Sequence, residues 1–383
     1  MKLSIGTNLM HKKIPLSEPN LDKKDMKSVV KTIKSRKLSA GQRITEFENE
    51  LASFIGVKFA ISTSSATTAL HLALASLDNL SAGDEVILPA YTFPACVNTV
   101  ITSGLVPVFV DISPGTLNID ATKIEKAITK KTKVIIPVDA FGVPHNKKEI
   151  QEIAQSRNLR IIEDAACALG ARHSDTFVGN SNNSVIFSFH QRKIITTGEG
   201  GAITTNSELL AKRLKLLRSH GADAGELYSK FTLAGFNFRF NEMGAALGVT
   251  QLRKLEQNIA FHEKIAMNYR SNLEEIKDID ISPLENYAGR IYQSIVICLK
   301  NKGVRDRTIR YLRESNIETT LGTYYLPEQP AYKSFLRDSI FPVAKKIGET
   351  SLALPVYKKL SNKDIDFICQ KLIKSVSTHS LKV

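Results

Sequence analysis

The sequence has few cysteines and no long apolar run. The 383 residues include only four cysteines: Cys96, Cys167, Cys298 and Cys369. Their wide spacing excludes a paired zinc-type motif and a disulfide framework, so we predict a reducing compartment and no metal site. No apolar run has the length of a membrane span, and the N-terminal segment MKLSIGTNLMHKK has too few apolar residues for a signal peptide. By elimination we expect a cytoplasmic protein that does not contact a membrane.

Acidic residues are also scarce relative to basic ones. There are 38 Asp and Glu against 52 Lys and Arg, which gives a formal net charge of +14. Such an excess can reflect a nucleic acid, a membrane surface or an anionic substrate. The lysines are dispersed, however, and no basic arm with interleaved aromatic residues is present. We therefore expect no nucleic acid partner, and an anionic small substrate remains compatible with the charge.

The order of apolar patterns predicts the fold class. Between about residues 40 and 220, strand-like runs such as EVILP, KVIIPV and LRIIE alternate with helical patterns such as ATTALHLALASL. This alternation is typical of an α/β domain with a mostly parallel sheet. One long helix pattern follows from about 241 to 274, and the remaining segments predict a smaller α+β unit. We predict two domains, residues 1–255 with the N-terminal segment and residues 256–383.

Three predicted strand ends carry polar residues, and ligands of parallel sheets bind at such ends. In ISTSSATTALHLAL, a helix begins near Ala66 and Thr67, which predicts either a phosphate site or a plain N-cap. In LRIIEDAACALGA, Asp164 follows a strand directly, either as an N-cap or as the partner of a cofactor cation. In SVIFSFHQRKIITTGEGGAI, Lys193 follows a buried strand. A lone lysine there is more often a surface residue, so its significance depends on the other two.

Together the three features match the requirements of pyridoxal 5'-phosphate (PLP). This cofactor needs an anion cradle, a carboxylate for its ring nitrogen and a lysine that forms a Schiff base with its aldehyde. A lysine with an ordinary pKa is neutral only about once in 2,500 at pH 7. Burial favours the neutral amine, so a sheltered position would prepare Lys193 for attack on an aldehyde.

At these residues the sequence resembles the DegT/DnrJ/StrS-type family of PLP-dependent sugar aminotransferases. The motifs that carry the resemblance are SSATTALHLAL, PAYTFPACVNTV, PVFVDI, EDAACALGA, FSFHQRKIITTGEGGAI and GFNFRFNEMGAALG. The resemblance implies a fold-type-I PLP-dependent transferase, a large α/β domain with a smaller C-terminal α+β domain, which forms a homodimer with shared active sites. It also implies transfer of an amino group from an amino acid, L-glutamate in the family, to a nucleotide-linked keto-hexose. The product would be an amino-sugar for surface polysaccharide, glycan or antibiotic biosynthesis.

The resemblance also assigns roles to individual residues. Lys193 resembles the Schiff-base lysine and Asp164 the partner of the pyridinium nitrogen. Phe93 resembles the aromatic residue that lies against the ring, and Asn237 the asparagine that reaches the phosphate of the neighbouring subunit. The phosphate ligands implied are Ala66, through its backbone, Thr67 and Ser188. Candidate substrate residues are His190, Arg239, Tyr324 and Tyr325.

One position departs from the family pattern. Cys167 stands where the family commonly has His or Gln. A thiol is small and a weak hydrogen-bond donor, so this position predicts a weaker hold on the cofactor ring without a change of reaction class.

Two alternative functions remain open at this point. Some relatives with a histidine at the lysine position are dehydratases, so a PLP-dependent sugar dehydratase or an epimerising enzyme is one alternative, although Lys193 favours transamination. The other is a non-enzymatic, DNA-binding regulator on the same fold. The run Gly198-Glu199-Gly200-Gly201 predicts a tight turn behind the cofactor rather than a dinucleotide-binding motif.

Overall fold

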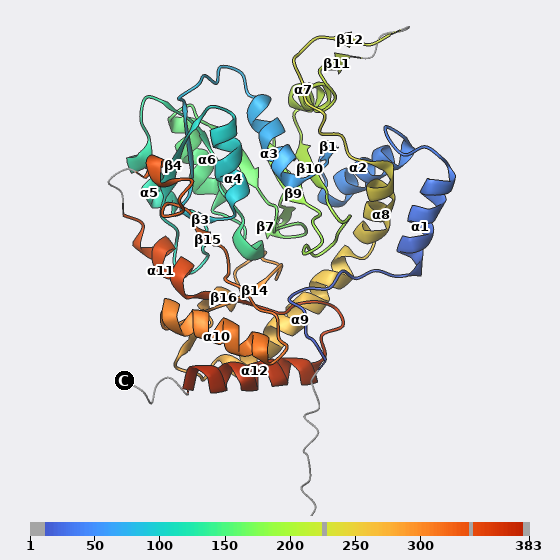
Figure 1. Ribbon diagram of the computed structural model, residues 1–383. Coiled ribbons are helices and arrows are strands. Elements are labelled where there is room, and N and C mark those ends of the chain that lie inside the picture. The colour runs from blue at the N-terminus through green and yellow to red at the C-terminus, as the bar shows by residue number, and fades with distance from the viewer. Residues whose placement is uncertain (1–11, 224–227, 337–339, 378–383) are drawn as a thin grey trace, which may run out of the picture.

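A central seven-stranded sheet organises the larger part of the protein (Figure 1). The computed structural model describes residues 12–223, 228–336 and 340–377, so most of the N-terminal segment considered for a signal peptide lies outside the described residues. All neighbouring strands from β9 to β4 are parallel, whereas β10 lies antiparallel to both β9 and β1. The predicted α/β class with a mostly parallel sheet is therefore confirmed. In sheet order the strands are β1 (Phe59–Thr63), β10 (Gly201–Thr205), β9 (Ser184–Ser188), β6 (Arg160–Asp164), β5 (Thr132–Ile135), β2 (Glu85–Pro89) and β4 (Val106–Val110).

Helices cover both faces of this sheet because side chains alternate along each strand. In β2, Val86 and Leu88 pack in the core formed with α3 (Ala66–Ala75), α4 (Pro94–Thr102) and α7 (Glu208–Arg218). Ile87, between them, packs in the opposite core with α5 (Ala121–Ala127) and α6 (Lys147–Ser156). A further core joins α2 (Gln42–Ile55) and α8 (Glu242–Leu252) to β9 and β10.

The predicted long helix from 241 to 274 is wrong, because the chain turns at Arg253 and Lys254 between α8 and α9 (Leu255–Leu273). Lys254 has φ −106° and ψ −2° at the start of α9. Its ammonium group forms ion pairs with Asp22 at 2.7 Å and with Asp25 at 2.5 Å, beside α1 (Lys23–Lys34). These partners are more than 200 residues away in sequence, so the local helix pattern contained no sign of the break.

The C-terminal part is a three-stranded antiparallel sheet covered by helices (Figure 1). Ile297, Leu312 and Leu372 lie in its core. The helix α9 connects the two parts, since Leu255 packs in the core with α2 and α8 and Ile265 packs in the C-terminal core. Ile14, which the sequence analysis groups with the large domain, also lies in the C-terminal core. The elements here are β13 (Ile279–Asp280), β14 (Ile295–Leu299), β16 (Ser351–Leu354), α10 (Lys302–Glu314), α11 (Pro342–Thr350) and α12 (Asn362–Ser377).

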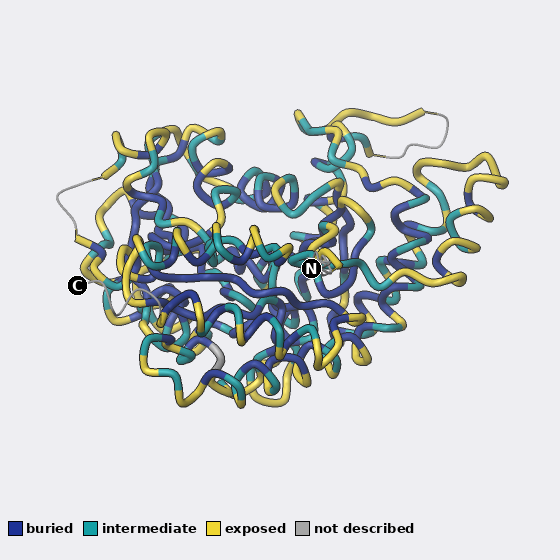
Figure 2. The backbone as a smooth tube through the Cα atoms, turned by 60° about the horizontal axis from the view of Figure 1, so that its bottom comes forward, coloured by how far each residue is buried: buried dark blue, intermediate teal, exposed yellow. Residues whose placement is uncertain are grey.

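Among the described residues, three short antiparallel strand pairs lie outside the two larger sheets. The pairs are β3 (Tyr91–Thr92) with β15 (Tyr324–Tyr325), β7 (Arg172–His173) with β8 (Thr176–Phe177), and β11 (Ala222–Asp223) with β12 (Lys230–Phe231). Figure 2 shows that buried backbone is concentrated in the middle of the molecule and exposed backbone at its margins. None of the helices within the described ranges combines the length and apolar character needed to cross a membrane.

Candidate active site

Lys193 lies in the loop between β9 and β10. Its backbone N–H donates to the His190 carbonyl at 2.8 Å, and its Nζ donates to the Cys167 Sγ at 3.0 Å. The side chain is half-buried rather than fully buried as predicted. The loop follows the carboxyl end of β9, and the Lys193 side chain there is partly exposed to solvent.

Distant residues hold the chain on both sides of Lys193. Gln293 accepts a hydrogen bond from the Ile194 N–H at 3.0 Å and donates to the Arg192 carbonyl at 2.9 Å. Asn258, in α9, donates to the Ile194 carbonyl at 2.9 Å. No local motif marks Gln293 and Asn258 as partners of the lysine loop, so neither residue could be predicted from the sequence.

Asp164 ends β6 and is 6% exposed. Its Oδ2 accepts from the Cys96 thiol at 2.8 Å and its Oδ1 from the Ala166 N–H at 3.0 Å. Burial raises the pKa of Asp164, and the Cys96 thiol, the Ala166 amide and the charge of Lys193 act against that rise. No helix begins after Asp164 in the described residues 165–171, but its side chain caps the turn that follows through the Ala166 N–H, so the capping role and the cofactor role stay compatible. The carboxylate is buried with only weak or neutral donors in contact.

The turn between β1 and α3 presents free backbone N–H groups at the same edge. Ser65 is the N-cap of α3, and its hydroxyl accepts from the Thr68 N–H at 3.1 Å. The first N–H groups of the helix, those of Ala66 and Thr67, have no acceptor among the described residues. The N-cap of the two alternatives is thus present at Ser65. The capped helix still offers two N–H donors that an anion could accept, so the phosphate site stays a prediction.

Gly201 allows this turn to lie against β10. A Cβ at Gly201 would lie 2.4 Å from the Ser65 carbonyl carbon and 2.5 Å from the Ala66 nitrogen. Only glycine permits so close an approach of two backbones. Gly198 has φ +83°, which confirms the predicted tight turn in this run. The hydroxyl of Ser188, at the end of β9, accepts from the His190 N–H at 3.4 Å.

Phe93 and Tyr324 form an exposed aromatic pair. Tyr324 is opposite Thr92 in the β3–β15 ladder, and its ring centroid lies 6.4 Å from that of Phe93. Phe93 is 62% exposed, which is unusual for a large apolar side chain unless something covers it. Tyr325 is the next residue on the strand and packs against Gly348 of α11. The structure thus brings Tyr324, but not Tyr325, to Phe93.

The remaining predicted residues lie around this edge. The His190 Nε2 is 3.7 Å from a Glu199 carboxylate oxygen, and burial lowers the pKa of His190. Asn237 and Arg239 are exposed on either side of Phe238, whose carbonyl accepts from the Ser64 N–H at 3.0 Å. This bond places the GFNFRF segment beside the turn that precedes α3.

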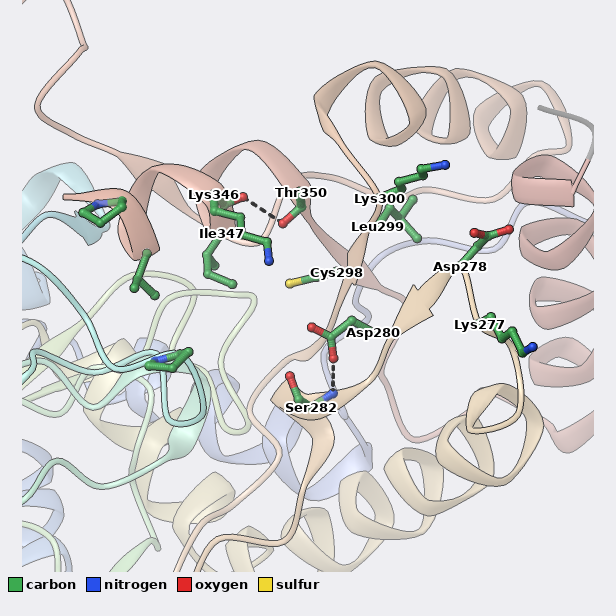
Figure 3. Close-up of a pocket in the computed structure, with 13 residues that line it drawn as sticks. Lys277, Asp278, Asp280, Ser282, Cys298, Leu299, Lys300, Lys346, Ile347 and Thr350 are labelled. Carbon is green, nitrogen blue, oxygen red and sulfur yellow. Dashed lines mark hydrogen bonds between the residues drawn. The ribbon is translucent and has the colours of Figure 1, made fainter. Parts of the chain in front are cut away.

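A cavity of about 620 Å³ lies away from Lys193, between the C-terminal sheet and α11 (Figure 3). Asp280, Lys346 and Cys298 are among its lining residues. Figure 3 shows Asp280 accepting from the Ser282 N–H and Thr350 donating to the Lys346 carbonyl. Its lining carries charges of both signs, and none of the predicted site residues lines it.

Comparison with known proteins agrees with the geometry at the sheet edge. Residues 19–373 match the DegT/DnrJ/EryC1/StrS aminotransferase family. The protein belongs to this family. It is 36% identical over 364 residues to GDP-perosamine synthase of Caulobacter vibrioides, covering 94% of this chain and 97% of that protein.

Solved structures lead to the same family. The aminotransferase PseC of Helicobacter pylori, involved in pseudoaminic acid biosynthesis, has a TM-score of 0.91 and 29% identity, covering 96% of this chain and 100% of that one. Spr1654 of Streptococcus pneumoniae in its PLP form has a TM-score of 0.89 and 26% identity, covering 96% of this chain and 99% of that one. The protein is a PLP-dependent sugar aminotransferase.

The residues at the sheet edge fit this cofactor. The two free N–H groups at the start of α3 suit a phosphate, and the buried Asp164 carboxylate suits a cationic ring nitrogen. The half-buried amine of Lys193 suits the aldehyde.

Proposed function

We propose that the protein transfers an amino group from an amino acid, L-glutamate by family analogy, to a nucleotide-linked keto-hexose. The observation that carries this proposal is the position of Lys193 and Asp164 at one edge of the sheet, with Asp164 at the end of β6 and Lys193 in the loop that follows β9. When bound, PLP supplies an electron-accepting ring that stabilises negative charge on the donor's α-carbon. The basic surface would favour an anionic nucleotide sugar.

In this proposal, Lys193 is the general base and acid. Its Nζ would take the proton from the donor's α-carbon and deliver it to the aldehyde-derived carbon of the cofactor, so that the amino group stays behind when the ketoacid leaves. Gln293 and Asn258 restrain the loop on both sides of the lysine, so they act as positioning residues. Asp164 keeps a proton on the ring nitrogen, because its buried negative charge has no competing cation in contact.

Other residues hold the cofactor and the substrate. The phosphate would be bound by the backbone of Ala66, by Thr67 and by the Ser188 hydroxyl. Phe93 would cover the ring. Cys167, whose Sγ lies 3.0 Å from the Lys193 Nζ, would lie near the ring edge in place of the usual His or Gln. His190, Arg239 and Tyr324 are the candidate substrate residues, whereas Tyr325 faces away from Phe93.

We also propose that the active enzyme is a homodimer. On α1, Met26, Val30 and Ile33 are 48–59% exposed and are spaced to form one helix face. An apolar stripe of this kind is typical of an interface. Asn237, which is exposed near the α3 turn, would reach the phosphate bound by the other subunit.

The experiment is an assay of the PLP-loaded enzyme with L-glutamate and a panel of nucleotide keto-hexoses. The proposal predicts equimolar 2-oxoglutarate and nucleotide amino-sugar, and no product from the Lys193→Ala variant. A dehydratase or epimerase would change the sugar without consuming glutamate. Salt-dependent DNA binding by a chain that retains no cofactor would favour the regulator and would contradict the proposal.

A further inference from the structure

A second buried polar cluster lies behind the active site. Asp139 follows β5, His145 precedes α6, and His173 ends β7. Each offers one possible ligand atom, and these atoms all lie within 4.8 Å of one another. The backbone N–H of Asp139 donates to the Asp164 carbonyl at 2.9 Å, so this residue of the cluster lies beside the end of β6.

Hydrogen bonds within the chain satisfy this cluster only in part. The Asp139 Oδ1 accepts from the backbone N–H of His145 at 2.8 Å and lies 2.7 Å from its Nδ1. Asp139 is 0% exposed, and its Oδ2 has no hydrogen-bond partner in the described part of the chain. The buried Nε2 of His173 has none there either, although its ring centroid is 5.1 Å from that of His145. A buried polar atom without a partner costs about 1–3 kcal/mol.

A second buried carboxylate increases the imbalance of charge. Glu163, in β6, is 1% exposed and is close enough for its charge to act on both histidines. Its Oε1 accepts from Ser181 and Asn183, while its Oε2 has no partner among the described residues. Two carboxylates are thus buried here, and each has one oxygen without a hydrogen-bond partner among the described residues. A cation beside them would stabilise these buried anions.

We propose that Asp139, His145 and His173 bind a divalent transition metal ion of the zinc class. Two imidazole nitrogens and a carboxylate oxygen are donors that such ions prefer, whereas Mg²⁺ prefers oxygen donors alone. The ion would use the unpartnered Asp139 oxygen and His173 nitrogen, and its charge would balance Glu163. Cysteine spacing could not reveal this site, because none of its ligands is a cysteine.

The metal ion would connect three segments of the chain: the one after β5, the one before α6, and β7. His173 belongs to the β7–β8 hairpin, and its neighbour Arg172 donates its backbone N–H to the Gly289 carbonyl at 2.7 Å. His145 precedes Asn146, the N-cap of α6, and Asp139 lies beside Asp164 in the segment that follows β5. We therefore assign the ion a structural role, separate from the aminotransferase reaction.

The test measures metal content, so its result does not depend on the proposed function. The PLP-loaded full chain is equilibrated with chelator-buffered Zn²⁺ or with Mg²⁺ and analysed by mass spectrometry for metal per chain. We expect about one Zn²⁺ per chain, no retained Mg²⁺, and an affinity at least about tenfold lower in His173→Asn.

His262→Asn is the matched control, because His262 is also buried and its Nδ1 lies 2.8 Å from the Tyr292 carbonyl oxygen, outside the cluster of Asp139, His145 and His173. It should bind Zn²⁺ as the wild type does. Anomalous diffraction from wild-type crystals at the zinc edge locates the ion even if a variant fails to fold. The proposal is overturned by a wild type without Zn²⁺, by equal affinity in His173→Asn, or by an anomalous peak elsewhere, such as at Cys167.

Discussion

Asp164 and Asp139 are two buried aspartates with different surroundings, one at the end of β6 and the other in the segment that follows the neighbouring β5. Asp164 accepts hydrogen bonds from a thiol and from one backbone amide, and it is close enough to Lys193 for the lysine charge to act on its pKa. Asp139 is bonded to an imidazole and is enclosed with a second histidine. The comparison shows how one sheet edge can hold two carboxylates for different purposes. One has weak donors and suits a cofactor cation, and the other has nitrogen ligands and suits a metal ion.

The largest expected effect is a loss of kcat on substitution of Asp164, which the same substitution of Asp139 should not cause. A carboxylate about 4 Å from a positive charge, at an effective dielectric constant of 20, gains about 4 kcal/mol. Asp164→Asn removes that interaction, so we expect kcat to fall by about 10³-fold. Asp139→Asn should lower kcat by less than about tenfold in steady-state transamination. Equal losses in the two variants would contradict the division of roles.

The next effect concerns the phosphate end of the site. Gly201→Ala places a Cβ against the backbone of Ser65 and Ala66, so the start of α3 must shift. We expect the Kd for PLP to rise by about tenfold and the free energy of unfolding to fall by about 1–3 kcal/mol. A PLP titration and urea denaturation measure the two quantities.

Gly303→Ala is the control for this glycine, since a Cβ there would meet only the ends of the Asn301 and Arg307 side chains. It should leave PLP affinity unchanged. An unchanged Kd in Gly201→Ala would mean that the α3 turn does not hold the phosphate.

A smaller effect tests the thiol that contacts Asp164. Cys96→Ala leaves the Oδ2 of that carboxylate without its donor, and a lost hydrogen bond of this kind costs about 1 kcal/mol. We expect PLP affinity to fall about fivefold, whereas Cys96→Ser, which keeps a donor, should remain close to the wild type. Equal affinities for the alanine and serine variants would show that the thiol only fills space.

The smallest effect concerns His190. Burial lowers its pKa below the usual value of 6.5, so the imidazole is neutral above that pH and gains no proton between pH 7 and 8. His190→Gln should raise the KM for the keto-sugar by less than about tenfold and leave the pH profile flat in this range. A step between pH 7 and 8 that the variant abolishes would give His190 a catalytic protonation instead.

The sequence predicted the parts of the site that depend on local pattern. The strand before Asp164, the start of α3 near Ala66 and the turn at Gly198 all follow from neighbouring residues. The half-burial of Lys193 and the bonds from Gln293 could not be predicted in this way, because the partners are about 100 residues apart. The break at Lys254 and the histidine cluster likewise depend on contacts between distant segments.

The covalent attachment of PLP to Lys193 tests the central claim most directly. The PLP-loaded enzyme is reduced with borohydride, digested and mapped by peptide mass spectrometry. We predict that the pyridoxyl group is found on Lys193 alone. A reduced protein with no label on that residue, or with the label on another lysine, would contradict the proposed active site.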